Sequence, residues 1–132
     1  MISVTVVVTT RNRKEDLRIC LASVQRQTLK VETIVIDDAS TDGTGDMIRA
    51  EFPDVRLIGH QEMHGYIRGR NEGARLATGE VLVSLDDDAA FSSDRIIEHA
   101  LACFDDDRVA AVAIPYIDVN REPTVRQVAP DA

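Results

Sequence analysis

Two kinds of apolar pattern alternate along the chain. Short runs rich in β-branched residues predict strands, and between them apolar residues recur every three or four positions, which predicts helices. The predicted strands cover residues 3–9, 33–36, 55–58, 81–85 and 109–114, and the predicted helices cover residues 13–27, 41–52, 67–77 and 93–104. This alternation is typical of an α/β fold with a mainly parallel, open sheet and helices on both faces.

Local signals predict where the helices begin and where the regular pattern stops. Asn12 precedes Glu15 by three residues, the spacing of a capping box, so we expect Asn12 to cap the first helix. Ser92 or Ser93 is the expected cap of the last helix. The pattern fades after residue 115, which predicts one domain over residues 1–115 and an irregular tail over 116–132.

Three adjacent acids, Asp86, Asp87 and Asp88, directly follow the apolar run of residues 81–85. Neighbouring carboxylates repel one another, so they need a cation or several hydrogen-bond donors close by. Carboxylate oxygens suit Mg²⁺ or Mn²⁺, and Mg²⁺ is typically held by one or two carboxylates together with substrate phosphates. The triplet therefore indicates either a metal–diphosphate clamp or a solvated acidic turn before the next helix.

Polar clusters follow two other predicted strands, at residues 9–13 and at Asp37 and Asp38, and Arg68 and Arg70 lie near the start of a helix. The carboxyl ends of parallel strands meet at one edge of the sheet, where open α/β folds bind their ligands. Acids for a base, a ribose and a metal would lie there beside arginines and a helix N-terminus for phosphates. This convergence predicts a nucleotide-diphosphate site.

Four motifs taken together resemble a known family. They are Thr-Thr-Arg-Asn-Arg at 9–13, Val-Ile-Asp-Asp-Ala-Ser-Thr-Asp-Gly-Thr at 35–44, Arg-Asn-Glu-Gly at 70–73, and Gly-Glu at 79–80 leading to Leu-Asp-Asp-Asp at 85–88. Their order and spacing are similar to those of the family 2 glycosyltransferases of the GT-A fold over about residues 2–115. The resemblance implies transfer of a sugar from a nucleotide-diphosphate sugar to an acceptor, usually with inversion, using Mg²⁺ or Mn²⁺.

The same resemblance implies a role for individual residues. Asp38 would accept a hydrogen bond from the base, typically uracil, while Asp37 holds its loop. Asp87 would face the ribose or the sugar, and Asp88 the metal, with Asp86 as the alternative metal ligand. The nucleotide-binding residues implied as a set are Thr9, Thr10, Arg11, Asn12, Arg13, Asp38, Arg68, Arg70, Asp86 and Asp87. An aromatic residue often stands in this family at the position of Arg11.

Residues 116–132 contain no motif that resembles the acceptor-binding half of the family. We therefore expect this chain to be the donor-binding half of a larger enzyme, without its own general base. The donor would be a UDP-sugar, and the acceptor a sugar, a lipid or a polysaccharide.

Three other classes of protein compete with this interpretation. A receiver domain places its acidic pair after the first strand and a lysine after the last, whereas here the pair follows the second strand and the lysines, Lys14 and Lys30, come early. A dinucleotide-binding domain needs Gly-x-Gly-x-x-Gly after the first strand, and residues 10–13 contain no glycine. A non-catalytic nucleotide-binding module remains open.

Charge and composition narrow the setting. The formal net charge of −8 argues against a nucleic-acid groove, which would be basic, and fits a cation-requiring site or an acidic, soluble surface equally well. There is no apolar run of membrane-spanning length, and the first residues lack the charged flank and cleavage site of a signal peptide, so we expect neither a membrane span nor a leader here. Cys20 and Cys103 lie in helical patterns, and we expect both to be buried thiols in a reducing compartment. These features predict a cytoplasmic location, either free or at the cytoplasmic face of a membrane in the full-length protein.

Overall fold

A computed structural model of the chain describes residues 2–120 and 126–127. Four strands form a parallel sheet in the spatial order β3-β2-β1-β4. Their bounds are β1 Val4–Thr10, β2 Glu32–Asp37, β3 Arg56–Gly59 and β4 Val81–Ser84. The helices are α1 Lys14–Gln25, α2 Thr44–Glu51, α3 Tyr66–Leu76 and α4 Ile96–Ala102, and a 3-10 turn, Cys103–Asp105, follows α4. The predicted α/β class with a mainly parallel sheet is confirmed.

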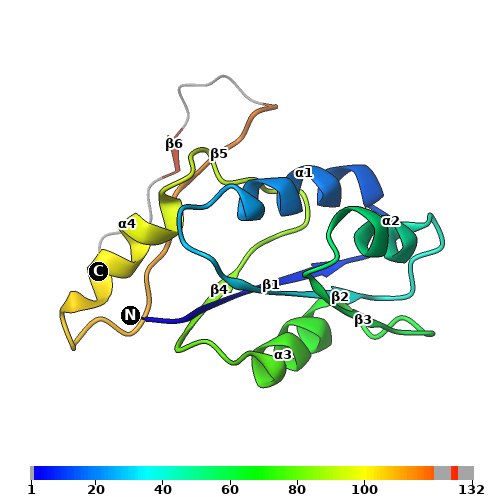
Figure 1. The fold of residues 1–132 in the computed structure, drawn as a ribbon, viewed down its shortest axis with the longest axis horizontal. Coiled ribbons are helices and arrows are strands. Elements are labelled where there is room, and N and C mark those ends of the chain that lie inside the picture. The colour runs from blue at the N-terminus through cyan, green and yellow to red at the C-terminus, as the bar shows by residue number, and fades with distance from the viewer. Residues whose placement is uncertain (1, 121–125, 128–132) are drawn as a thin grey trace.

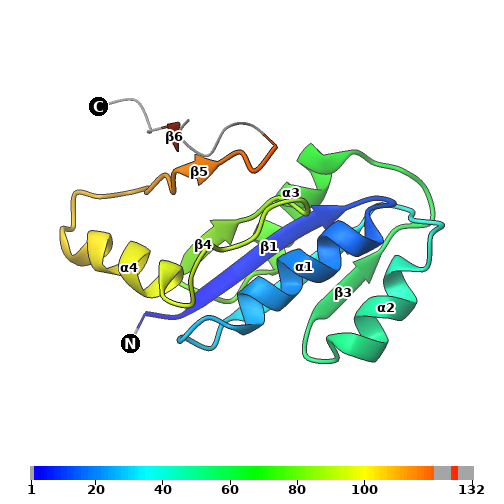
Figure 2. The ribbon, with the colours of Figure 1, turned by 90° about the horizontal axis from the view of Figure 1, so that it is seen from above.

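Helices cover both faces of this sheet, as expected. Figure 1 shows α1 and α2 on one side and α3 on the other, and Figure 2 shows α1 lying along β1. The central strand β1 is buried on both faces, which explains its β-branched sequence. Val4, Val6 and Val8 pack into the core beneath α1 and α2, while Val7 packs with Ile34 and neighbouring residues on the α3 side.

Helix α3 lies unusually close to the sheet because two of its glycines face it. A Cβ atom on Gly73 would come within 2.3 Å of Val7 Cγ1, and one on Gly69 within 2.9 Å of Thr9 Cγ2. Both distances are too short for a real side chain, so only glycine permits this approach. The contact sets the distance between α3 and the sheet. It thereby sets the position of Arg70 at the carboxyl ends of the strands.

Two predicted segments differ from the structure. Residues 109–114 form no strand in the part of the chain that the structure describes, and Ile114 is 41% exposed. The run is apolar and β-branched, but a strand needs a neighbouring strand to accept its hydrogen bonds, and this run has none there. The last helix begins at Ile96 rather than near Ser93, whose carbonyl oxygen instead accepts a hydrogen bond from Gln27 Nε2 at 2.7 Å.

The remaining described elements are two short antiparallel strands, β5 Tyr116–Ile117 and β6 Arg126–Gln127. They lie in the segment for which the sequence predicted no regular structure, and residues 121–125 and 128–132 of that segment are outside the described residues. Within the described ranges, no helix has the length and apolar character needed to cross a membrane.

Candidate functional site

The carboxyl ends of β1 and β4 meet at Asp87. Its Oδ2 accepts a hydrogen bond from Thr10 Oγ1 at 2.9 Å, and the residue is only 8% exposed. Burial raises the pKa of Asp87; the Thr10 hydrogen bond and the charge of Arg13 oppose this, while Asp88 and Asp86 add to it. The middle acid of the triplet therefore turns inward and joins two strand ends.

The outer two acids turn toward solvent and face arginines. The side chains of Asp86 and Asp88 are 62% and 55% exposed. Arg70 Nη2 from α3 lies 2.5 Å from Asp86 Oδ1, while Arg13 Nη1 lies 3.1 Å from Asp88 Oδ2 and 3.4 Å from Asp87 Oδ1. Two arginines from separate elements thus relieve the repulsion among the three carboxylates.

A buried thiol contacts the backbone of this acidic loop. Cys20, on α1, is fully buried, and its Sγ lies 3.5 Å from the carbonyl oxygen of Asp86. Burial, with the charges of Asp87, Asp88 and Asp86, raises the pKa of Cys20 to about 12, so the thiol stays protonated and can donate to that carbonyl. The sequence predicted a buried thiol here, but not its contact with the acidic loop. Cys103 is exposed, and its predicted burial is wrong, because it lies in the turn after α4 rather than on the inner face of a helix.

The second acidic pair lies at the end of β2, where Asp37 is the last residue of the strand, and its two members hold different loops. Asp37 Oδ1 accepts from the Ser40 N–H at 3.1 Å, which is the loop-holding role expected of Asp37. Asp38 Oδ1 accepts from the His64 N–H at 2.8 Å, and Asp38 Oδ2 from the Gly65 N–H at 2.9 Å. Asp38 therefore holds the loop that precedes α3, a contact that the sequence did not predict.

Two residues to which the sequence assigned no role complete this second cluster. His60, the residue after β3, places Nδ1 3.1 Å from Asp38 Oδ1 and Nε2 2.6 Å from Glu72 Oε2 on α3. Burial raises the pKa of Asp38, but the hydrogen bonds from His64, His60 and Gly65 lower it by more than burial raises it. The pKa of Asp38 therefore lies below its ordinary value. The available signal for His60 was its place directly after a strand, at the same sheet edge as the acids.

Asn12 joins two loops instead of capping α1. It has a left-handed backbone, with φ of 52°; its N–H donates to Ser40 Oγ at 2.9 Å, and its Oδ1 accepts from the Thr41 N–H at 2.7 Å. The first turn of α1 is capped by a residue that is distant in the sequence: the Lys14 N–H donates to Asp42 Oδ2 at 3.0 Å. The predicted capping box is therefore wrong.

The other predicted nucleotide-binding residues surround these clusters without joining them directly. Thr9 lies against Gly69 of α3. The Arg11 guanidinium contacts the sulfur of Met63 in the loop before α3. Arg68 is exposed on α3. Their contacts with a nucleotide stay predictions.

The acidic loop supplies suitable oxygen ligands for a divalent cation, but only a few of them. Among residues 2–120 and 126–127, no group of three or more His, Cys, Asp or Glu side chains is placed to hold a metal on its own. Asp86 and Asp88 are exposed carboxylates, and an ion held by one or two of them needs phosphate oxygens or water to complete its shell. The residues present thus fit a metal bound together with a diphosphate.

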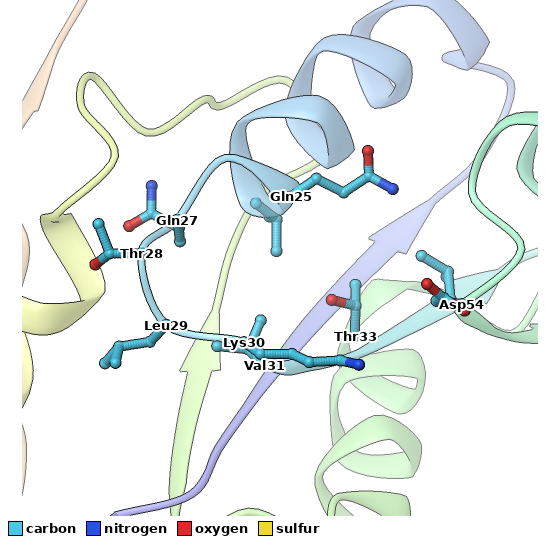
Figure 3. Close-up of a pocket in the computed structure, with 10 residues that line it drawn as sticks. Gln25, Gln27, Thr28, Leu29, Lys30, Val31, Thr33 and Asp54 are labelled. Atoms are coloured by element: carbon cyan, nitrogen blue, oxygen red, sulfur yellow. The ribbon is translucent and has the colours of Figure 1, made fainter.

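A hollow of about 490 Å³ lies at the opposite edge of the sheet and is separate from this site. Figure 3 shows residues that line it, including Gln27, Lys30, Thr33 and Asp54, which come from the loop after α1, the start of β2 and the approach to β3. These are the amino ends of the strands, whereas the acidic clusters follow the carboxyl ends.

Together, the parallel sheet and the polar residues at its carboxyl edge define an open α/β fold, the class that binds ligands at the carboxyl ends of its strands. Comparison with known proteins gives the family. The model of glycosyl transferase family 2 matches residues 5–130, and the chain belongs to that family.

Relatives and solved structures agree with this assignment. The chain is 30% identical over 93 residues to glycosyltransferase AglE of Haloferax volcanii and 34% identical over 87 residues to an uncharacterized glycosyltransferase, YibD, of Escherichia coli. These matches cover 66% and 63% of this chain but 31% and 25% of those relatives. The chain thus spans about a third or less of their length.

Two solved structures share the fold. Mannosyltransferase PcManGT of Pyrobaculum calidifontis, in complex with GDP-Man and Mn²⁺, aligns with a TM-score of 0.73 at 31% identity, over 80% of this chain and 33% of that chain. S. aureus TarS 1–349, in complex with UDP-GlcNAc, aligns with a TM-score of 0.70 at 22% identity, over 86% of this chain and 37% of that chain. The second likeness supports the GT-A fold alone.

Proposed function

We propose that this chain binds the nucleotide-diphosphate sugar of a glycosyl transfer reaction at the carboxyl edge of its sheet. The observation that carries the proposal is the arrangement of two exposed aspartates, Asp86 and Asp88, beside Arg70 and Arg13. The arginines supply fixed positive charge for phosphate oxygens, and the carboxylates supply ligands for a cation. Membership of glycosyl transferase family 2 supports a sugar as the group transferred.

Asp88, with Asp86 as the alternative, would hold Mg²⁺ or Mn²⁺ together with the diphosphate. The cation would neutralise charge on the departing diphosphate. In the structure, Arg13 pairs with Asp88 and Arg70 with Asp86. When a cation binds these acids, the two arginines would turn toward the phosphates. PcManGT, which was solved with GDP-Man and Mn²⁺, supports the use of a divalent metal.

The environment of Asp38 supports uracil as the base. Asp38 Oδ1 already accepts from the His64 N–H and faces His60 Nδ1, while among the described residues Oδ2 accepts only from the Gly65 N–H. A carboxylate oxygen accepts about two hydrogen bonds, so a single position is left, on Oδ2. Uracil offers one imide N–H, whereas guanine offers two adjacent donors. We therefore propose a UDP-sugar as the donor.

In this proposal residues 1–115 bind the donor, and the general base and acceptor site lie elsewhere in the enzyme. The carboxylates at the sheet edge already have partners in Thr10, Arg13 and Arg70, and a carboxylate beside a cation is a poor base. The acceptor is a sugar, a lipid or a polysaccharide, and attack on the sugar inverts its anomeric centre. Both cysteines are free, which supports a reducing, cytoplasmic location.

Calorimetry tests the proposal directly. We expect UDP and a UDP-sugar to bind in the presence of Mn²⁺, to bind more weakly after EDTA, and to bind more tightly than GDP or GDP-mannose. Binding that is equal with and without the metal would contradict the clamp, and a preference for GDP would contradict the uracil assignment. If no nucleotide binds under any of these conditions, the proposed function is wrong.

A further inference from the structure

His60 lies between two carboxylates at the edge of the nucleotide site. Its backbone N–H donates to the carbonyl oxygen of Asp37 at 2.8 Å, which holds it beside the end of β2. The side chain is only 11% exposed. Nδ1 lies 3.1 Å from Asp38 Oδ1, and Nε2 lies 2.6 Å from Glu72 Oε2.

This placement favours one protonation state of the ring. An ionised carboxylate only accepts hydrogen bonds, so both ring nitrogens must carry a proton to bond both acids. The neutral ring carries one proton and would turn a lone pair toward the other carboxylate. The hydrogen bond to Asp38 raises the pKa of His60; burial opposes this, and Glu72 adds to the rise.

The groups that face the ring come from every element packed around it. Asp38 comes from the end of β2, Glu72 from α3, and His64 from the loop between β3 and α3. The His64 ring stacks on the His60 ring, with centroids 4.6 Å apart and planes 25° apart. In the part of the chain that the structure describes, two acids and one further histidine are thus the titratable groups that contact the His60 ring.

The two carboxylates connect to different parts of the site. Asp38 holds the backbone of His64 and Gly65, which leads into α3. Glu72 stands two residues after Arg70, which pairs with Asp86 of the acidic loop. The bridge through His60 therefore joins the acid proposed to read the base to the helix that carries a proposed phosphate-binding arginine.

We propose that His60, in its protonated form, is a positioning residue that clamps Asp38 to Glu72 and so holds the two halves of the nucleotide site in register. The proposal rests on the function proposed above. Because the pKa of His60 is raised in the fold, the clamp is complete below its ordinary value of 6.5 and is lost as the pH rises through the raised value. Nucleotide affinity should fall over the same range.

The decisive comparison is between the wild-type chain and Glu72→Gln. A glutamine amide can donate to Nε2 of a neutral His60, whose Nδ1–H then still bonds Asp38, so the clamp no longer needs the second proton. Affinity for UDP with Mn²⁺ would be measured by calorimetry from about pH 6 to about pH 9, which spans the titration of histidine. We expect the wild type to lose affinity about tenfold, the loss of one hydrogen bond to a charged group, and Glu72→Gln to lose little.

Two further variants complete the design. His60→Ala should bind weakly at every pH, and His99→Gln, which changes an exposed histidine on α4, should keep the wild-type profile. Titration of UDP itself would affect the wild type and Glu72→Gln alike. A flat wild-type profile, or an equal slope in both proteins, would overturn the proposal while leaving nucleotide binding intact.

A second measurement does not depend on the nucleotide. The titration of the His60 ring, followed by NMR in the free chain, should lie above 6.5 in the wild type and move down in Glu72→Gln. A His60 that titrates at its ordinary value in the wild type would overturn the clamp. The absence of UDP binding at every pH would instead show that the proposed function is wrong.

Discussion

Asp86, Asp87 and Asp88 are neighbours in the sequence, but each has a different environment. Asp87 is buried against Thr10, whereas Asp86 and Asp88 face solvent and arginines. The sequence showed that three carboxylates need compensating charge or donors, and the structure supplies both. Which of the three turns inward was not predictable, because it depends on Thr10, 77 residues away in the chain.

At this residue scale, the exposed position of Asp88 leads to the first prediction. Asp88→Asn should remove the metal-dependent part of UDP binding and leave the fold intact, because the side chain is half exposed and packs into no core. Calorimetry with Mn²⁺ and with EDTA measures the effect, and thermal unfolding checks the fold. The control is Asp107→Asn, the same change in an exposed aspartate at the end of a second run of three aspartates, residues 105–107. A variant that still responds to Mn²⁺ as the wild type does would rule out Asp88 as a ligand.

Asp38 holds the loop before α3, and we propose that it also reads the base; one substitution tests both. Asp38→Ala should weaken UDP binding by roughly 1–3 kcal/mol through the lost bond to the base. It should also lower the free energy of unfolding by about 1–3 kcal/mol, because the N–H groups of His64 and Gly65 lose their acceptor.

Calorimetry and urea denaturation measure these two effects of Asp38→Ala, with Asp54→Ala, an exposed acid near the opposite edge of the sheet, as the control. Reduced stability with unchanged affinity would make Asp38 a loop-holding residue only.

At the scale of elements, the packing of α3 against the sheet sets the positions of its polar side chains. Its glycines at 69 and 73 let the helix approach β1 closely, and this brings Arg70 to Asp86 and Glu72 to His60. The sequence predicted the helix and its arginines from local pattern. It gave no indication that Gly73 was the contact point, because a glycine within a helical pattern has many possible explanations.

Gly73→Ala tests the importance of this close approach. The added Cβ would meet Val7 Cγ1 at 2.3 Å, so α3 must shift away from β1. Overpacking of this kind typically costs about 1–3 kcal/mol of stability, and the shift of Arg70 should also weaken UDP binding. Gly59→Ala is the matched control, because no atom lies within 4 Å of the added Cβ there. Equal urea midpoints for the two variants would contradict the packing argument.

At the scale of the whole molecule, the acids at the sheet edge already accept hydrogen bonds or pair with arginines. The proposed function assigns these acids to binding the nucleotide-sugar and the metal. A general base must lie within about 3 Å of the acceptor hydroxyl or act through one water. We therefore expect the 132-residue chain to bind UDP-sugars without acceptor-stimulated transfer. Release of UDP from several UDP-sugars, with and without sugar and lipid acceptors, measures this. Turnover that rises with an acceptor would show that a base is present.

The sequence by itself determined the class of fold and the edge of the sheet at which the candidate site residues lie. Strand and helix periods are local properties, so the alternation of elements could be read directly. The rule that parallel strands end at one edge then brought residues 9–13, Asp38 and 86–88 together. The same local patterns failed at residues 109–114, because an apolar run becomes a strand only when another strand pairs with it.

Only the tertiary structure decided what each polar side chain does at that edge. Asn12 fits a capping box by spacing, but its amide oxygen meets the Thr41 N–H, 29 residues away. His60 has no motif around it, yet it bonds acids 22 residues before it and 12 residues after it. Hydrogen bonds are short and directional, so partners that are distant in sequence are chosen by how the elements pack, and spacing along the chain carries no record of them.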